Sequence, residues 1–300
     1  MKDNKIRILY VTEAFDGGIY RFLLELSNQL ENRAQIYIAY EDNDRTSMVC
    51  KDDFVQGIRL IPMTRGCSSH RNLNCLAGIR KYRNLVKQIQ PDVVHVHSSV
   101  EGMWGRWAFV HNPCSTFYTP HGFAFLNDKP KWKMLIYRWI ERISATRPCR
   151  IIACGMQEFQ IAKSFCKDSL CVLNGINLKQ LQLADDSADV GLKKQLEVLT
   201  VSRNVWQKNL DLFNAIAGRL PEVAFVWAGD EKKDDLDEFV NTILMVANEK
   251  EEKLQQIRMN AYQTVVDKYN AEKMADQYYD IYQEAVSNQK RNGIDRWYTG

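Results

Sequence analysis

The sequence predicts an α/β protein with a doubly wound parallel sheet in residues 1–180 and a second, smaller α/β domain in residues 181–300. Short apolar runs alternate with longer segments of 3.6-residue periodicity, which is typical of strands joined by crossover helices. The chain then turns polar between residues 174 and 197, as linkers do. Its 300 residues also fit two domains.

The first domain holds seven apolar runs that are short enough to be strands. The first run leads through a glycine turn into a helix with one apolar face. Apolar runs of this kind are typical of strands that are buried on both faces of a sheet. We expect strands at residues 6–12, 35–40, 58–63, 92–97, 116–119, 150–154 and 170–173.

The second domain begins after the polar segment around Asp185-Asp186-Ser187. A strand at 196–202, a helix at 209–219 and a strand at 223–228 repeat the α/β pattern. After Asp230 the pattern is helical, from 238 to 287, and we interpret 291–300 as a frayed tail. This domain therefore shows two clear strands.

The composition excludes several classes of protein. A content of 45% apolar and 26% charged residues is that of a globular chain. The net charge of +3 argues against nucleic acid as a partner. Eight scattered cysteines without a C-x-x-C pair indicate a reduced, cytosolic chain without structural zinc. The polar start and the lack of a long apolar run leave only a peripheral membrane role.

Gly17 and Gly18 follow the first strand and open a helix. Free backbone N–H groups and the helix dipole attract phosphate at such a position. A tight turn that needs small residues explains the pair equally well. The G-x-G-x-x-G pattern is incomplete, which argues against a nicotinamide-dependent enzyme.

Histidines mark the ends of two central strands. His97 and Ser98 end the strand at 92–97, and open α/β sheets hold ligands at that edge. His95 shares the face of His97, and we interpret it as a hydrogen-bonded core imidazole. After the next strand, Gly122 lets the backbone approach a ligand closely, so His121 is predicted to contact one.

Residues 129–150 form a basic, aromatic segment with one acid, Glu141. Such a helix favours docking on an anionic membrane surface, where each cation adds roughly 1 kcal/mol. A solvated basic face that covers the sheet fits the segment equally well. The cations are Lys129, Lys131, Lys133, Arg138, Arg142, Arg147 and Arg150, and the aromatic residues are Trp132, Tyr137 and Trp139.

Arg203 and Lys208 lie five positions apart in the loop from the strand at 196–202 to the following helix. Two cations beside a helix N-terminus can converge on one anion, which the helix dipole also favours. We interpret them as a clamp for a diphosphate.

These motifs, in this order, resemble the retaining glycosyltransferases of family four. The resemblance covers residues 6–230 and 239–282 and implies the GT-B fold, two Rossmann-like domains facing a cleft. The motifs that carry it are Gly17-Gly18, Asp92-Val-Val-His-Val-His97, Thr119-Pro-His121-Gly122-Phe123, Ile152-Ala-Cys-Gly-Met-Gln-Glu158, Asn174-Gly175-Ile176-Asn177, Arg203 with Lys208, and the terminal Asn260-Ala, Tyr269, Met274-Ala, Tyr279 and Tyr282.

The family transfers a sugar from a nucleotide sugar to a saccharide or a lipid-linked acceptor. The resemblance implies that Arg203 and Lys208 hold the donor diphosphate and that His121 contacts the donor sugar. It also implies that Gly17 and Gly18 line the donor cleft. The implied acceptor or cleft residues are His97, Ser98, Glu158 and Asn174, the last at the approach to a hinge.

One feature of the family is missing. Its members usually carry Glu-x7-Glu in the second domain, and no two glutamates here stand eight positions apart. Asp230 and Glu238 have that spacing, but Asp230 ends a strand, so we take the match as coincidence. The second domain therefore resembles a shortened donor domain, whose open sheet edge favours a homo-oligomer or a partner glycosyltransferase.

The expected function is retaining sugar transfer in surface polysaccharide or glycan biosynthesis, with UDP as the expected donor nucleotide. No metal and no tightly bound cofactor are expected. The expected location is the cytoplasm, including the inner face of the membrane. The alternative is a catalytically impaired remnant that binds an acceptor or a partner glycosyltransferase.

Overall fold

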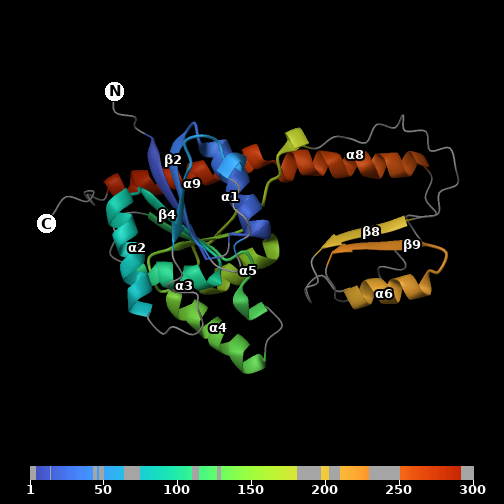
Figure 1. Ribbon diagram of the computed structural model, residues 1–300, viewed down its shortest axis with the longest axis horizontal. Coiled ribbons are helices and arrows are strands. Elements are labelled where there is room, and N and C mark those ends of the chain that lie inside the picture. Colours follow the sequence, from blue (N-terminus) through green and yellow to red (C-terminus); the bar gives the residue numbers. More distant parts are fainter. Residues whose placement is uncertain are drawn as a thin grey trace. The chain divides into compact units, whose positions relative to one another are not determined.

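A computed structural model describes residues 5–13, 15–42, 46, 51–63, 75–109, 115–126, 130–180, 197–202, 210–229 and 251–291 of the 300-residue chain. The chain divides into two compact units (Figure 1). The first unit is Met1–Gln180 with Val266–Gly300, and the second is Leu181–Val265.

Seven parallel strands form the sheet of the first unit, in the order β3-β2-β1-β4-β5-β6-β7. All seven predicted strands are confirmed. The order reverses between β1 and β4, so the sheet is doubly wound as predicted. The strands are β1 (Ile6–Thr12), β2 (Ala34–Glu41), β3 (Arg59–Met63), β4 (Val93–His97), β5 (Ser115–Thr119), β6 (Arg150–Ala153) and β7 (Leu170–Cys171).

Four of the crossover helices pack on one face of this sheet. Their apolar residues cluster there with Leu9, Val94 and Val96 of β1 and β4. The helices are α2 (Cys75–Ile89), α3 (Ser99–Ala108), α4 (Lys131–Ser144) and α5 (Met156–Phe165), and the single-turn 3-10 helices of this unit are η1 (Lys51–Asp53), η2 (Ala124–Leu126) and η3 (Leu178–Gln180).

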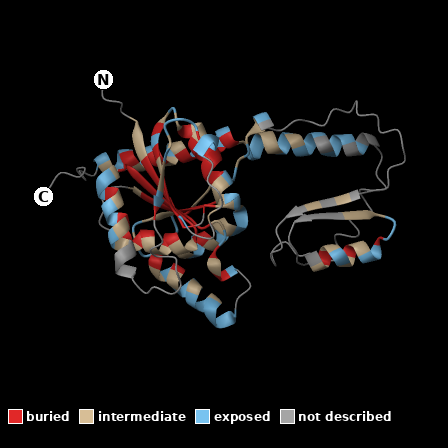
Figure 2. Ribbon diagram, in the orientation of Figure 1, coloured by how far each residue is buried: buried red, intermediate tan, exposed pale blue. Residues whose placement is uncertain are grey.

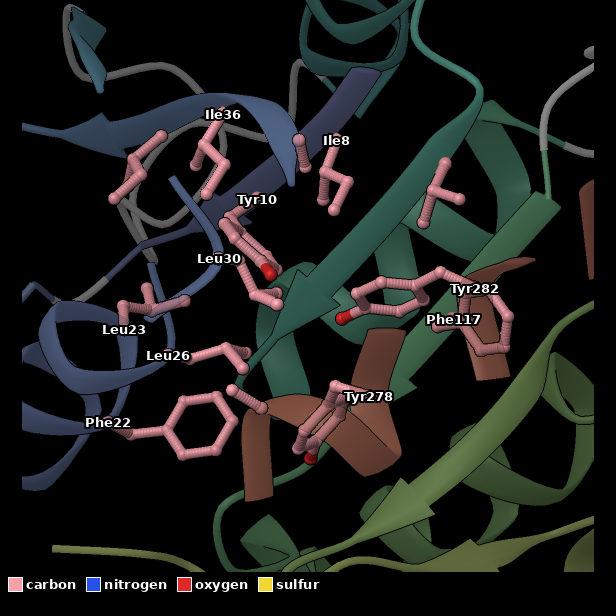
Figure 3. Packing of buried hydrophobic residues seen from close by; sticks show 14 of the residues in the cluster. Ile8, Tyr10, Phe22, Leu23, Leu26, Leu30, Ile36, Phe117, Tyr278 and Tyr282 are labelled. Carbon is pink, nitrogen blue, oxygen red and sulfur yellow. The ribbon is translucent and has the colours of Figure 1, made fainter. Parts of the chain in front are cut away.

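The opposite face carries α1 (Gly17–Leu30) and the distant helix α9 (Ala271–Arg291). Phe22, Leu23, Leu26 and Leu30 of α1 are buried there, as the apolar periodicity predicted. Figure 3 shows the α1 residues beside Tyr278 and Tyr282.

Helix α9 occupies the part of this face that the local connections leave bare. Right-handed crossovers send α2 to α5 to the other face, so β4 to β6 need a cover from elsewhere in the chain. Tyr278 and Tyr282 of α9 are fully buried against it. The sequence pattern predicted that all of residues 181–300 form the second domain, whereas residues 266–300 belong with the first unit because of this packing.

Gly175 lets the chain cross close to the start of α9. The Ile176 N–H donates to the Tyr269 carbonyl over 2.7 Å, and the Ala271 N–H donates to the Ile176 carbonyl over 3.0 Å. A Cβ on Gly175 would lie 2.5 Å from the Ala271 Cα, which only glycine avoids. The motif around Asn174, which the resemblance placed at the approach to a hinge, thus fixes where α9 begins.

The second unit contains the predicted strand-helix-strand pattern. Strands β8 (Glu197–Ser202) and β9 (Ala224–Gly229) pair in parallel, and α6 (Leu210–Arg219) connects them. Leu212, Ile216 and Leu220 form its small buried cluster. Within the predicted helical stretch, α8 (Glu251–Lys268) precedes α9. No helix among the described residues is long and apolar enough to cross a membrane.

Candidate functional site

The candidate site lies at the carboxyl edge of the sheet, at the switch point between β1 and β4. Open α/β sheets bind ligands there because the connections from the two neighbouring strands diverge. Polar residues end the strands at this edge: Glu13 follows β1, His97 and Ser98 end β4, His121 follows β5, and Cys154 follows β6. Glu13, His97 and Ser98 are buried.

A chain of three side chains connects neighbouring strand ends. His97 Nδ1 lies 3.1 Å from His121 Nε2, and His121 Nδ1 lies 3.6 Å from the Cys154 Sγ. The Phe22 ring of α1 packs edge-on against His121, with ring centroids 4.9 Å apart. Because the neutral His121 imidazole carries a single N–H, it donates to one of its two neighbours, His97 or Cys154, and accepts from the other.

Burial keeps these histidines neutral. It lowers the pKa of His121 to about 3. Burial, reinforced by His95 and His121, also holds the pKa of His97 well below its usual range. A neutral imidazole can both donate a hydrogen bond to a sugar hydroxyl and accept one from it, whereas a charged imidazole can only donate.

His97 Nε2 and Ser98 Oγ are buried at this edge and have no hydrogen-bond partner within the described part of the chain. Buried polar groups are normally paired, so atoms of this kind are candidates for contact with a bound polar molecule. Both atoms belong to residues that the sequence pattern predicted for the site.

The backbone is strained where β4 and β5 end. Ser98 has a φ of 75° and His121 a φ of 51°, and Gly122 follows with a φ of 97°. Non-glycine residues rarely adopt positive φ, and such residues are concentrated at functional sites. The Ser98 N–H donates to the Thr119 carbonyl over 3.0 Å, which joins the two strained turns.

Glu158 holds the His121 turn in place. Its Oε2 accepts a hydrogen bond from the Cys154 N–H and its Oε1 accepts one from the Gly122 N–H, both over 2.7 Å. Burial raises the pKa of this carboxyl, while the two backbone donors lower it. Glu158 is therefore a positioning residue for the loops after β5 and β6, and its contact with an acceptor stays a prediction.

His95 is the core imidazole that the sequence predicted. The Thr119 hydroxyl donates to the Ile152 carbonyl over 2.8 Å, so it accepts from the His95 Nε2–H, also over 2.8 Å. His95 Nδ1 then accepts from the Tyr282 hydroxyl over 2.6 Å. This network joins α9 to the His97, His121 and Cys154 side chains, because the His95 and His97 ring centroids lie 4.2 Å apart.

The other predicted site residues lie in different surroundings. Gly17 and Gly18 are exposed at the start of α1, one turn before Phe22 and its contact with His121. Asn174 is exposed and precedes the crossing at Gly175. Arg203 and Lys208 lie outside the described residues, as do Asp230 and Glu238.

Sequence reasoning missed three members of the site. Glu13 and Cys154 directly follow the strands β1 and β6, so the rule that selected His97 could have found them. Tyr282 comes from α9 and carries no local signal of its position. Among the described residues, no three His, Cys, Asp or Glu side chains are placed to hold a metal ion.

Comparison with protein families identifies the first unit. The family model described as Glycosyltransferase Family 4 matches residues 16–180, which is more than half of the chain. The chain belongs to glycosyltransferase family 4. The match includes strands β2 to β7, so His97, Ser98, His121 and Cys154 lie within the part that defines this family 4 chain.

Two curated proteins are similar to this family 4 chain. It is 30% identical over 204 residues to the UDP-Gal:alpha-D-GlcNAc-diphosphoundecaprenol alpha-1,3-galactosyltransferase of Escherichia coli, covering 62% of this chain and 52% of that protein. It is 26% identical over 228 residues to an uncharacterized 41.2 kDa protein in the cps region of Klebsiella pneumoniae, covering 70% and 60%. The chain thus matches little more than half the length of these relatives.

Solved structures share the GT-B fold with this family 4 chain at low sequence identity. A glycosyltransferase from Rickettsia africae has a TM-score of 0.65 and 14% identity, covering 95% of this chain and all of that one. The sucrose-phosphate synthase of Thermosynechococcus elongatus has a TM-score of 0.59 and 14% identity, with coverages of 91% and 73%. Anabaena HepE in complex with UDP and glucose has a TM-score of 0.57 and 14% identity, with coverages of 80% and 66%.

Proposed function

We propose that the chain transfers a sugar from a nucleoside-diphosphate sugar to a saccharide or lipid-linked acceptor, with retention of configuration, in surface polysaccharide or glycan biosynthesis. The observation that carries the proposal is the family 4 match over strands β2 to β7, with His97, Ser98 and His121 at the carboxyl ends of β4 and β5. The Escherichia coli relative, named for a UDP-galactose donor and a diphosphoundecaprenol acceptor, supports UDP and a lipid-linked acceptor. We place the protein in the cytoplasm or on the inner face of a membrane.

In this proposal the first unit binds the acceptor. The neutral His97 and Ser98 offer their unpaired atoms to a sugar hydroxyl. His121 contacts the donor sugar, and Gly17 and Gly18 bring free backbone N–H groups toward its phosphates.

The departing diphosphate takes up negative charge as the bond to the sugar breaks. We assign Arg203 and Lys208 to stabilise this charge, which is the main catalytic contribution in the proposal. The acceptor oxygen attacks the same face of the sugar, and the departing phosphate oxygen accepts the acceptor's proton. The proposal requires neither a metal nor a tightly bound cofactor.

A second candidate function rests on the missing glutamate pair. No two glutamates stand eight positions apart in the sequence, which supports a remnant that binds an acceptor or a partner glycosyltransferase without turnover. A homo-oligomer stays a prediction under both functions.

Thermal unfolding with nucleotides separates the two functions. We expect one of UDP, GDP or ADP, or a sugar conjugate of it, to raise the Tm. A ligand at a hundred times its Kd stabilises the folded protein by about 2.7 kcal/mol. The shift should be lost in the Arg203→Ala, Lys208→Ala double variant. It should remain in a control with two exposed cations removed from the first unit, Lys87→Ala with Lys163→Ala.

Transfer by the purified protein then decides between the functions. Product formation whose rate falls in the Arg203 and Lys208 variant, with the anomeric configuration of the donor kept, supports the proposed enzyme. A nucleotide-independent Tm together with no transfer to any acceptor overturns it in favour of the remnant.

A further inference from the structure

Helix α4 exposes a stripe of large apolar side chains. Trp132, Leu135, Ile136 and Trp139 have exposed fractions of 58%, 68%, 48% and 64%. At 3.6 residues per turn they share one stripe about 100° wide along the helix. Figure 2 shows most of α4 as exposed. We call these four residues the α4 stripe.

Cations flank the α4 stripe on both sides. By helical spacing, Lys131, Arg138 and Arg142 lie along one edge and Lys133 along the other, and all four are exposed. The one acid of α4, Glu141, is buried on the opposite side of the helix. It forms an ion pair with Arg106 over 2.6 Å and accepts a hydrogen bond from the Tyr118 hydroxyl over 2.9 Å. Every exposed charge on α4 is therefore positive.

This arrangement distinguishes the two interpretations that the sequence left open. A solvated basic face would carry polar residues along its centre, whereas the centre of the exposed face is apolar. An apolar centre with a Trp at each end and a cationic border fits the boundary between lipid headgroups and acyl chains. Each cation also gains attraction from an anionic lipid surface.

We propose that α4 docks the protein on an anionic lipid membrane, with the α4 stripe inserted among the headgroups and the flanking cations facing lipid phosphates. Helix α4 packs against η2, which follows the His121 turn within a few residues. Docking therefore holds the strand end that carries His121 near the lipid surface. The position of His121 near the lipid brings it to a lipid-linked acceptor only if the proposed function holds. The docking of α4 itself does not depend on the proposed function.

Co-sedimentation with vesicles tests the proposal without any measurement of activity. The full chain should bind vesicles that contain phosphatidylglycerol and phosphatidylcholine at least tenfold more tightly than vesicles of phosphatidylcholine alone. Lys133→Gln with Arg138→Gln should weaken binding roughly thirtyfold, at about 1 kcal/mol per cation. The matched control, Lys87→Gln with Lys163→Gln, removes two exposed cations from α2 and α5 and should bind as the unaltered protein does.

The apolar part is tested separately. Trp132→Gln with Trp139→Gln should weaken vesicle binding more than tenfold and abolish quenching of Trp fluorescence by brominated lipid. The control Met259→Gln removes an apolar side chain of similar exposure, 54%, from α8 and should leave binding unchanged. Far-ultraviolet circular dichroism confirms that each variant is folded.

Three results would overturn the proposal. The first is equal binding to neutral and anionic vesicles, and the second is binding that the Trp132 and Trp139 substitutions do not weaken. The third is a lipid-free dimer that the same substitutions convert to a monomer, because a second copy of the chain would then cover the α4 stripe. If the unaltered protein binds vesicles as expected but transfers no sugar, the proposed function is wrong and the docking proposal stands.

Discussion

Individual residues at the strand ends combine backbone strain with suppressed charge. His121 has a positive φ, and burial holds its pKa far below the ordinary histidine value. A backbone with positive φ at such a residue costs free energy, so it persists only where the surrounding structure holds it. Here Glu158 and Phe22 hold the His121 turn. The position of His121 after a strand was predictable from the sequence, whereas its partners His97 and Cys154 required the register of β4, β5 and β6.

His121→Asn should weaken the pH dependence of stability in the acid range. The pKa of His121 is about 3 in the folded protein and 6.5 ordinarily, so between these values only the unfolded chain binds the proton. Stability therefore falls as pH falls through this window, by up to about 1.4 kcal/mol per pH unit from this residue. Asn tolerates a positive φ, so the turn is kept. Urea unfolding at a series of pH values across the window measures the slope.

The comparison with the unaltered protein removes contributions that both share. Burial raises the pKa of Glu101 to about 8, and this group acts in the opposite direction between 4.5 and 8 because the folded chain then holds the extra proton. Identical slopes in the two proteins would mean that the His121 imidazole is solvated.

At the scale of elements, the long-range helix α9 completes the sheet that the local crossovers leave half covered. Apolar periodicity predicted that residues 238–287 are helical, and α8 and α9 confirm this for the described part. It could not show which sheet α9 covers, since many amphipathic helices would match that face. The hydrogen bond from Tyr282 to His95 joins residues 187 positions apart and specifies the docking.

Tyr282→Phe should destabilise the first unit by about 1–3 kcal/mol, because the buried His95 Nδ1 loses its donor. Tyr279→Phe on the same helix is the matched control. It removes a hydroxyl that receives an exposed hydrogen bond from Gln283 and keeps the ring under the Arg33 guanidinium, so its effect should be near zero. Chemical unfolding gives both free energies. Equal losses in the two variants would mean that the Tyr282 hydroxyl contributes no specific bond.

At the scale of the whole molecule, the two units are not the two halves of the sequence. The first unit takes its sheet from residues 1–180 and one of its covering helices from residues 266–300. The boundary at residue 180 follows from composition, because a polar segment begins there. The return of residues 266–300 to the first unit does not follow from composition, because it depends on the shape of the sheet face that α9 covers.

A fragment of residues 1–180 should therefore lack a cooperative thermal transition and bind the dye ANS. Without Met274, Tyr278 and Tyr282, the face over β4 to β6 is exposed to water. Adding a peptide of residues 266–291 should restore a cooperative melt, followed by circular dichroism. A peptide with Tyr278 and Tyr282 both changed to Ser is the control and should not restore it. A fragment that melts as the full first unit does would show that α9 is dispensable.

The sequence by itself determined the seven strands, their crossover helices, the edge that carries His97, Ser98 and His121, and the family, because burial on both faces of a parallel sheet leaves a strong local pattern. Only the tertiary structure decided which partners the histidines have, where α9 packs, and that the apolar stripe of α4 faces outward. These features depend on contacts between residues far apart in the chain, or on whether another of the described elements covers a face, and neither leaves a mark on the local periodicity.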